Sequence, residues 1–135
     1  MNFNPIPEHA MLRDSVRQFF ARELPERKIR EMDRARKIPR DIWRRMGELG
    51  WAGLSVPVEY GGSGADVMLA AVFVEELSRQ FPSMATDWLL ISMTARILRE
   101  VGSKEQQETL LPKLAAGEWL MSFGMTEPSG GTDVL

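Results

Sequence analysis

Hydrophobic residues recur along most of the chain at spacings of three and four, the period of an amphipathic α-helix. The first such segment, residues 7–24, has an apolar stripe made of Leu12, Val16, Phe19 and Phe20. Proline and glycine residues divide the pattern into six expected helices, at about residues 7–24, 26–37, 39–49, 66–81, 83–101 and 103–116. The pattern therefore predicts an all-α fold, an antiparallel helical bundle of about six helices.

Capping residues mark several of these expected helix ends. Asp66 and Ser83 are expected to cap the fourth and fifth helices, because their side chains can accept backbone N–H groups. Ser103 is expected to cap the sixth helix, with Gln106 as its capping-box partner. Pro112 lies inside the sixth helix and predicts a break or a tightened last turn there.

The hydrophobic period changes after the sixth helix. Residues 119–125 alternate in a way that favours a β-strand. Because a lone strand cannot satisfy its backbone groups, we expect it to be the first strand of a following β-domain in a longer protein. The expected domains are a helical domain at residues 1–118 and the start of a β-domain at residues 119–135.

Composition excludes several classes of function. The 17 basic and 19 acidic residues give a net charge of −2, whereas a nucleic-acid-binding domain normally has a basic excess. The chain has no cysteine and one histidine, His9, so no metal site and no thiol or histidine-based catalysis is expected. The sequence shows neither a secretory signal nor an apolar run long enough to cross a membrane, which predicts a cytoplasmic protein.

Two charged segments have plain structural interpretations. Residues 27–45 contain nine basic and three acidic residues. A phosphate-binding patch is one reading, but a solvated helical face is favoured because a single aromatic residue, Trp43, lies among the basic ones. Glu75 and Glu76 are adjacent and therefore point about 100° apart on a helix, so they cannot act alone as an acid–base pair.

A polar glycine turn near the end of the chain is the main candidate for ligand binding. Gly130 and Gly131 allow the backbone to approach a ligand closely, and successive N–H groups of such a turn can bind an anion. The hydroxyl of Thr132 would add a donor. An ordinary connecting turn is the alternative, because short glycine loops are weak motifs.

The run Phe-Gly-Met-Thr-Glu-Pro-Ser-Gly-Gly-Thr-Asp-Val at residues 123–134 resembles the flavin-contacting signature of the acyl-CoA dehydrogenase family. Gly130 and Thr132 stand where that family frequently has alanine and serine. Further segments resemble the family in the same order along the chain, at residues 12–19, 47–53, 56–62, 75–78, 102–107 and 111–118. The resemblance implies an N-terminal helical domain, a β-domain and a C-terminal helical domain.

The resemblance also implies a cofactor, FAD, and residues that contact it. Phe123, Met125 and Thr126 would lie beside the isoalloxazine, with the Met125 backbone and the Thr126 hydroxyl bonding its pyrimidine edge. Gly131 and Thr132 would reach the pyrophosphate, and Thr132 would also touch the CoA part of the substrate.

The implied reaction is α,β-dehydrogenation of an acyl-CoA thioester, with a carboxylate removing the α-proton and the flavin accepting the β-hydrogen as hydride. The family's catalytic glutamate belongs to the C-terminal domain, so no catalytic residue is expected in this chain. An electron-transferring flavoprotein is the implied electron acceptor, and a homotetramer is the implied assembly. A related acyl-CoA oxidase or flavin monooxygenase, or a non-catalytic helical interaction module, are the alternatives.

The fifth expected helix is apolar on more than one face, and the resemblance places it at the far end of the acyl pocket. Ala85, Leu89 and Met93 follow one another at four-residue spacing, so we expect them to line the acyl tail. Arg96 is unusual in this apolar stretch and could meet a polar acyl group or a carboxylate. Ordinary bundle core for the three apolar residues, and surface for the arginine, is the alternative.

Overall fold

The computed structural model describes residues 6–122, 124, 126–128, 130 and 131. These residues form six α-helices and one short 3₁₀-helix. Their bounds are α1 Pro7–Glu23, α2 Glu26–Ala35, α3 Arg40–Glu48, η1 Val58–Tyr60, α4 Val67–Gln80, α5 Pro82–Val101 and α6 Lys104–Ala115. The all-α prediction and the number of helices are therefore confirmed.

The helix ends follow from local chemistry. The Asp66 carboxylate accepts the Leu69 N–H at 2.8 Å at the start of α4. Ser103 and Gln106 form the predicted capping box at the start of α6. The prediction that Ser83 caps the fifth helix is wrong, because α5 begins one residue earlier. Pro82 occupies the first turn, where its missing N–H costs nothing.

Pro112 does not break the last helix. It lies inside α6, which continues to Ala115. Gly117 then takes a left-handed φ of 66° and ends the helix, as expected of a glycine at this position.

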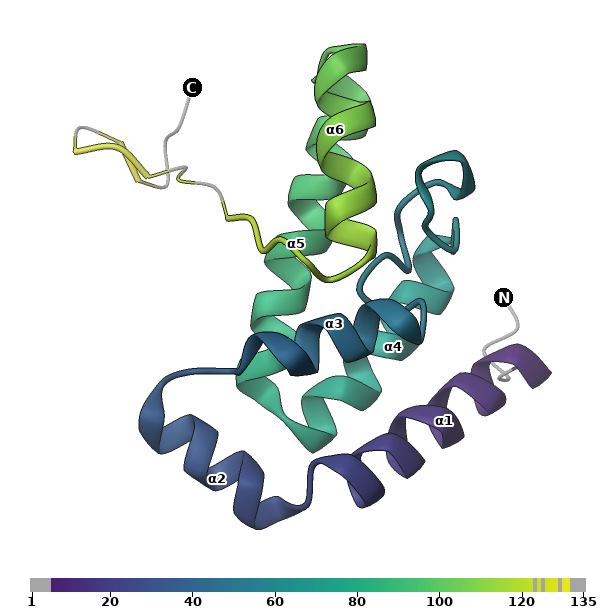
Figure 1. Ribbon diagram of the computed structural model, residues 1–135, viewed down its shortest axis with the longest axis vertical. Coiled ribbons are helices and arrows are strands. Elements are labelled where there is room, and N and C mark those ends of the chain that lie inside the picture. The colour runs from purple at the N-terminus through teal and green to yellow at the C-terminus, as the bar shows by residue number, and fades with distance from the viewer. Residues whose placement is uncertain (1–5, 123, 125, 129, 132–135) are drawn as a thin grey trace.

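Three pairs of helices make the main contacts of the fold. Helix α1 packs on α4, α4 on α5, and α5 on α6. In Figure 1, α5 and α6 run side by side in opposite directions, while α1 and α3 lie obliquely across the lower part of the molecule. Helix α5 therefore lies between two neighbours, which agrees with its apolar sequence.

Aromatic side chains connect α1, α4 and α5 through the core. The Phe19 ring meets Trp51 edge to face at 5.3 Å, Trp51 contacts Phe73 at 5.7 Å, and Phe73 contacts Trp88 at 4.9 Å between ring centroids. The Trp88 indole N–H donates to the Trp51 carbonyl at 2.8 Å, so its polar atom is satisfied within the core. This chain of rings fixes the segment between α3 and α4 against the helices.

The strand expected at residues 119–125 is not formed in the described part of that segment. Residues 119–122 and 124 have no strand assignment, and Phe123 and Met125 lie outside the described residues. An isolated bridge between Glu127 and Gly130 is the β-type pairing present in the described residues. A strand needs a partner for its N–H and C=O groups, and the helices offer none.

Candidate functional site

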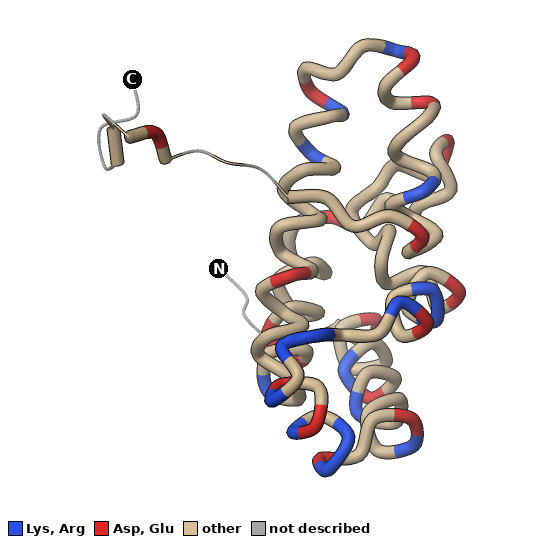
Figure 2. Tube along the Cα trace, turned by 60° about the vertical axis from the view of Figure 1, so that its left-hand side comes forward, with Lys and Arg blue, Asp and Glu red and all other residues tan. Residues whose placement is uncertain are grey.

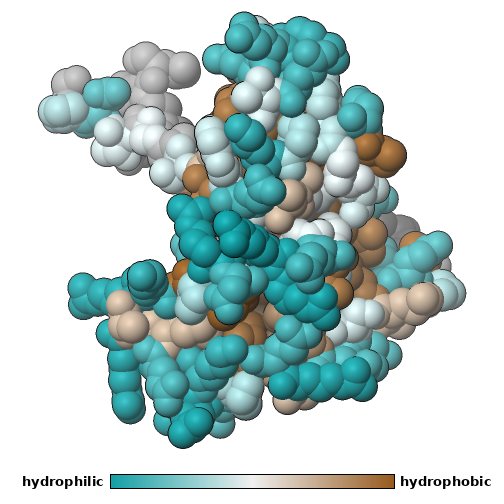
Figure 3. Space-filling view, viewed as in Figure 1, coloured by the Kyte–Doolittle hydropathy of each residue, from teal (hydrophilic) through white to brown (hydrophobic). Residues whose placement is uncertain are grey.

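A groove of about 500 Å³ lies between α4 and α5. The α4 side is formed by small and β-branched residues, and the α5 side by longer ones. Its lining includes Val67, Ala70, Val74, Leu89, Met93 and Arg96. The mixture of apolar walls and a few polar groups is typical of a small-molecule site. On the face drawn in Figure 3, by contrast, hydrophobic residues reach the surface only in patches between hydrophilic ones.

Two of the three residues predicted to contact the acyl tail line this groove. Leu89 and Met93 are 43% and 45% exposed. They leave their apolar surface open toward the groove. Ala85 is 2% exposed and belongs to the hydrophobic core instead. Each four-residue step rotates a side chain by about 40° around the helix axis, so Ala85 and Met93 point about 80° apart and do not share one narrow stripe.

Polar groups occupy defined places in the groove. Ser92 donates to the Ser55 hydroxyl at 3.2 Å, which ties α5 to the segment before α4. Arg96 lines the groove and is exposed, as is Arg99, which donates to Glu100.

The glycine turn is formed by a pair of backbone hydrogen bonds. The Glu127 N–H donates to the Gly130 carbonyl at 3.0 Å, and the Gly130 N–H donates to the Glu127 carbonyl at 3.1 Å. Thr126 and Gly131 are exposed, and a Cβ built on Gly131 would meet no atom within 4 Å. Phe123, Met125 and Thr132 lie outside the described residues. The exposure of Thr126 and the open space at Gly131 leave room for a ligand to approach the backbone of this turn.

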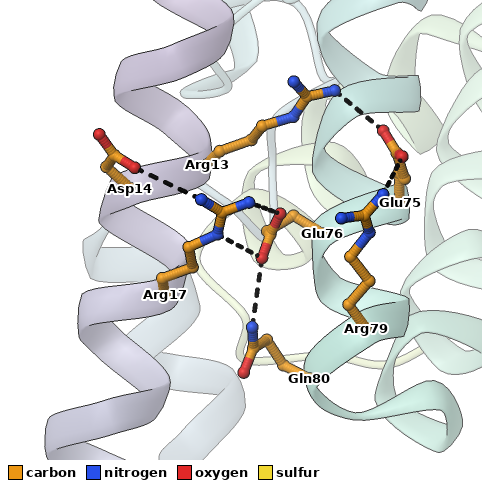
Figure 4. A network of polar contacts seen from close by, with 7 residues as sticks. All are labelled: Arg13, Asp14, Arg17, Glu75, Glu76, Arg79 and Gln80. Carbon is orange, nitrogen blue, oxygen red and sulfur yellow. Dashed lines mark hydrogen bonds and ion pairs between the residues drawn. The ribbon is translucent and has the colours of Figure 1, made fainter.

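A buried carboxylate that the sequence analysis did not single out joins α1 to α4 (Figure 4). Glu76 is 2% exposed, and both of its oxygens accept hydrogen bonds from the Arg17 guanidinium at 2.9 Å. Gln80 donates to the same carboxylate at 3.2 Å. The hydrogen bonds from Arg17 hold the pKa of Glu76 below its usual range, against the opposing effect of burial.

The neighbouring Glu75 has a different environment. It accepts from Arg13 of α1 at 3.0 Å and from Arg79 of α4 at 2.8 Å, and its side chain is about half exposed. The two adjacent carboxylates thus bind separate arginines, which confirms that they do not form a pair. The spacing of Arg13 and Arg17, one turn apart on α1, indicates that two cations share a helix face, but it does not indicate which glutamate each of them binds.

The basic segment at residues 27–45 is mixed with acidic residues (Figure 2). Arg45 bonds Glu48 at 2.8 Å and Glu23 at 3.2 Å, and Arg30 pairs with Glu26. This supports the interpretation as a solvated face.

Neither a metal site nor a membrane span is present in the part of the chain that the structure describes. The described residues contain no group of three or more histidine, aspartate and glutamate side chains that could hold a metal ion. None of the described helices is both long and apolar enough to cross a membrane.

Comparison with known proteins identifies the family. The family model described as "Acyl-CoA dehydrogenase, N-terminal domain" matches residues 6–118. The chain therefore belongs to the acyl-CoA dehydrogenase family.

A curated relative agrees with this assignment. The chain is 37% identical over 134 residues to a probable acyl-CoA dehydrogenase, YngJ, of Bacillus subtilis (strain 168). The match covers 98% of this chain and 35% of the relative. The chain thus spans about a third of the length of that relative.

Solved structures have the same fold. An acyl-CoA dehydrogenase from Geobacillus kaustophilus superposes with a TM-score of 0.88 at 30% identity, covering 99% of this chain and 35% of that one. A structure of the electron transferring flavoprotein of Acidaminococcus fermentans contains a chain that superposes with a TM-score of 0.86 at 33% identity, covering 99% and 35%.

Proposed function

We propose that the protein catalyses FAD-dependent α,β-dehydrogenation of an acyl-CoA thioester. The observation that carries this proposal is the groove between α4 and α5, in which Leu89 and Met93 supply an apolar surface for an acyl chain. Membership of the acyl-CoA dehydrogenase family supports an oxidoreductase. The catalytic base belongs to residues outside this chain, and neither Glu75 nor Glu76 takes that role, because both are engaged by arginines.

We also propose how the chain contributes to cofactor binding. The Thr126 hydroxyl would bond the pyrimidine edge of FAD, and the Gly131 backbone would approach its pyrophosphate. Phe123, Met125 and Thr132 complete this proposed set. When bound, FAD supplies the acceptor for the hydride. Residues 119–135 would accordingly begin a β-domain that follows the helical domain of residues 1–118.

In the groove, the role of the protein is to bind and orient the acyl chain. Burying methylene groups against Leu89 and Met93 stabilises the complex by about 0.8 kcal/mol per methylene. Excluding water from the same region strengthens the electrostatic interactions that stabilise charge at the thioester.

An electron-transferring flavoprotein is the proposed electron acceptor, supported by the similarity to a chain in the Acidaminococcus fermentans structure. A homotetramer is the proposed assembly. A related acyl-CoA oxidase or flavin monooxygenase is the second candidate within the same superfamily, and a non-catalytic helical module is the third.

Anaerobic addition of acyl-CoA to the protein purified from its complete reading frame tests the proposal. We expect the visible absorbance of bound flavin to bleach on addition of an acyl-CoA, and to recover on addition of an electron-transferring flavoprotein. Recovery with oxygen alone, at a comparable rate, would indicate an oxidase. Absence of bound flavin, or no bleaching with any acyl-CoA, would overturn the proposal and favour the non-catalytic module.

A further inference from the structure

The apolar surface that Leu89 and Met93 form on α5 lies next to a basic residue, Arg96. Leu89, Met93 and Arg96 follow one another at spacings of four and three, and all three line the groove. About two helical turns, or about 10 Å along the axis, separate Leu89 from Arg96. The groove wall therefore changes from aliphatic and thioether groups to a guanidinium within the length of a short acyl chain.

Arg96 forms no ion pair and no hydrogen bond within the described part of the chain, although its charge contributes, after that of Arg99, to the lowered pKa of Glu100. Arg99 donates to Glu100, one turn beyond Arg96. Asp66 is the acidic residue that lines the groove, and its carboxylate accepts the Leu69 N–H as the cap of α4. The charge at this end of the groove is thus positive and available to an anion.

Arginine is suited to this position by its chemistry. Its guanidinium stays charged at all physiological pH values and offers a planar fork of donors that matches a carboxylate. The aliphatic part of its side chain can pack along the apolar surface while the guanidinium remains at the edge of the groove. A carboxylate reaching it would form a charge-assisted pair with two hydrogen bonds.

We infer that Arg96 selects acyl-CoA thioesters that carry a carboxylate at the far end of the acyl chain. This inference rests on the proposed function, because it takes the groove as the place of the acyl chain. Leu89 and Met93 contact the methylenes, and the Arg96 guanidinium pairs with the terminal carboxylate. An acyl chain that ends in a methyl group would lie against the guanidinium and leave that charge partly desolvated without a partner.

The test compares two series of thioesters of equal chain length, one ending in a carboxylate and one in a methyl group. Flavin reduction is measured with the protein from its complete reading frame and with Arg96→Gln, Arg96→Lys and Arg34→Gln variants. Arg34 is an exposed arginine of α2, which does not line the groove. It serves as the matched control for loss of one positive charge.

We expect the ratio of kcat/KM for the carboxylate-ended over the methyl-ended thioester to fall about tenfold or more in Arg96→Gln. Most of that change should be in KM, since the contact lies far from the reacting atoms. Arg96→Lys should retain part of the preference, and Arg34→Gln should leave the ratio unchanged.

Three results would overturn the inference while leaving the proposed function intact. The first is that Arg96→Gln leaves the ratio of kcat/KM between the two series unchanged. The second is that Arg96→Gln and Arg34→Gln change this ratio equally. The third is that Arg96→Gln lowers the rates with both series alike and also lowers the melting temperature, as expected if Arg96 pairs with a carboxylate of the protein. Failure of the proposed function gives a different result, in which neither series of thioesters bleaches the flavin.

Discussion

Glu76 shows how one buried charge is made tolerable. A carboxylate removed from water is costly unless its oxygens are paired, and both oxygens of Glu76 are bonded to the Arg17 guanidinium. The partner guanidinium is half exposed and keeps its own contact with water. The pair therefore joins α1 to α4 through two charge-assisted hydrogen bonds.

We predict that Glu76→Gln lowers the free energy of unfolding by about 1.5–3 kcal/mol, the usual range for hydrogen bonds to a charged group. The amide can accept through one oxygen only, and its NH₂ group would face the Arg17 donors. Urea denaturation measures the change. Glu75→Gln is the control, because Glu75 is about half exposed and its loss should cost less than about 1 kcal/mol. Equal effects of the two changes would contradict the special role of Glu76.

The stabilisation from Glu76 should also depend on pH. Its pKa is lowered in the folded protein, mainly by the hydrogen bonds from Arg17, so its contribution is complete above the ordinary glutamate pKa of 4.5. It is lost as the pH falls through the lower pKa of the folded state. The stability difference between the parent protein and Glu76→Gln should therefore be constant near neutrality and shrink in acid.

The same measurement excludes the influence of other titrating groups. Burial raises the pKa of Asp87, which has the opposite effect on the pH dependence. Asp87 is present in both proteins, and its contribution cancels in the difference. A difference that grows in acid would show that the Glu76 carboxylate is not the stabilised form.

At the scale of elements, glycine decides how closely α3 and α6 approach. A Cβ on Gly47 would lie 2.1 Å from the Ala116 carbonyl oxygen, and a Cβ on Gly117 would lie 2.0 Å from the Trp43 carbonyl oxygen. Neither backbone can shift without moving a helix, because both contacts involve main-chain atoms. The two glycines thus allow the end of α6 to lie directly on α3.

We predict that Gly47→Ala destabilises the protein by about 1–3 kcal/mol through overpacking, even though alanine favours helices. Gly61→Ala is the matched control. A Cβ there meets no atom within 4 Å, so only the left-handed φ of 81° opposes the change, at about 1 kcal/mol. Thermal unfolding of the two variants compares them, and a stabilised Gly47→Ala would refute the close contact.

Helical periodicity predicted the elements well because burial of one helix face dominates their formation. The stripe of Val16, Phe19 and Phe20 is buried as expected, and the capping box at Ser103 was visible in the sequence. The start of α5 was predicted wrongly, because Pro82 both follows the end of α4 and occupies the first turn of α5. The strand predicted after residue 118 is not formed in the described residues, because the formation of a strand depends on pairing with distant residues that a local pattern does not reveal.

The candidate site was predictable only in part, for a similar reason. Leu89 and Met93 share a helix face, so their place in the groove could be read from spacing. Ala85 lies on the same spacing but is buried, so four-residue spacing alone does not decide which of these side chains is exposed. The Arg17–Glu76 contact joins residues far apart in sequence, and no local pattern specifies which of two adjacent glutamates turns inward.

At the scale of the whole molecule, the groove and the glycine turn belong to separate parts of the chain. The groove lies between α4 and α5, whereas the chain leads away from these helices after α6 (Figure 1). An acyl chain in the groove and a flavin at the turn would therefore be held by different segments. Changes in the groove should alter the choice of acyl chain without removing the flavin.

We predict that Leu89→Trp shifts the substrate preference toward shorter acyl chains. The indole would fill groove space that longer chains need, so kcat/KM for the longest accepted acyl-CoA should fall about tenfold or more relative to a short one. Ile97→Trp is the control, because Ile97 is 45% exposed on the same helix but does not line the groove. Flavin content, read from the absorbance spectrum, should be the same in both variants. An unchanged chain-length preference in Leu89→Trp would place the acyl chain elsewhere, and loss of flavin would show that the groove and the turn are not independent.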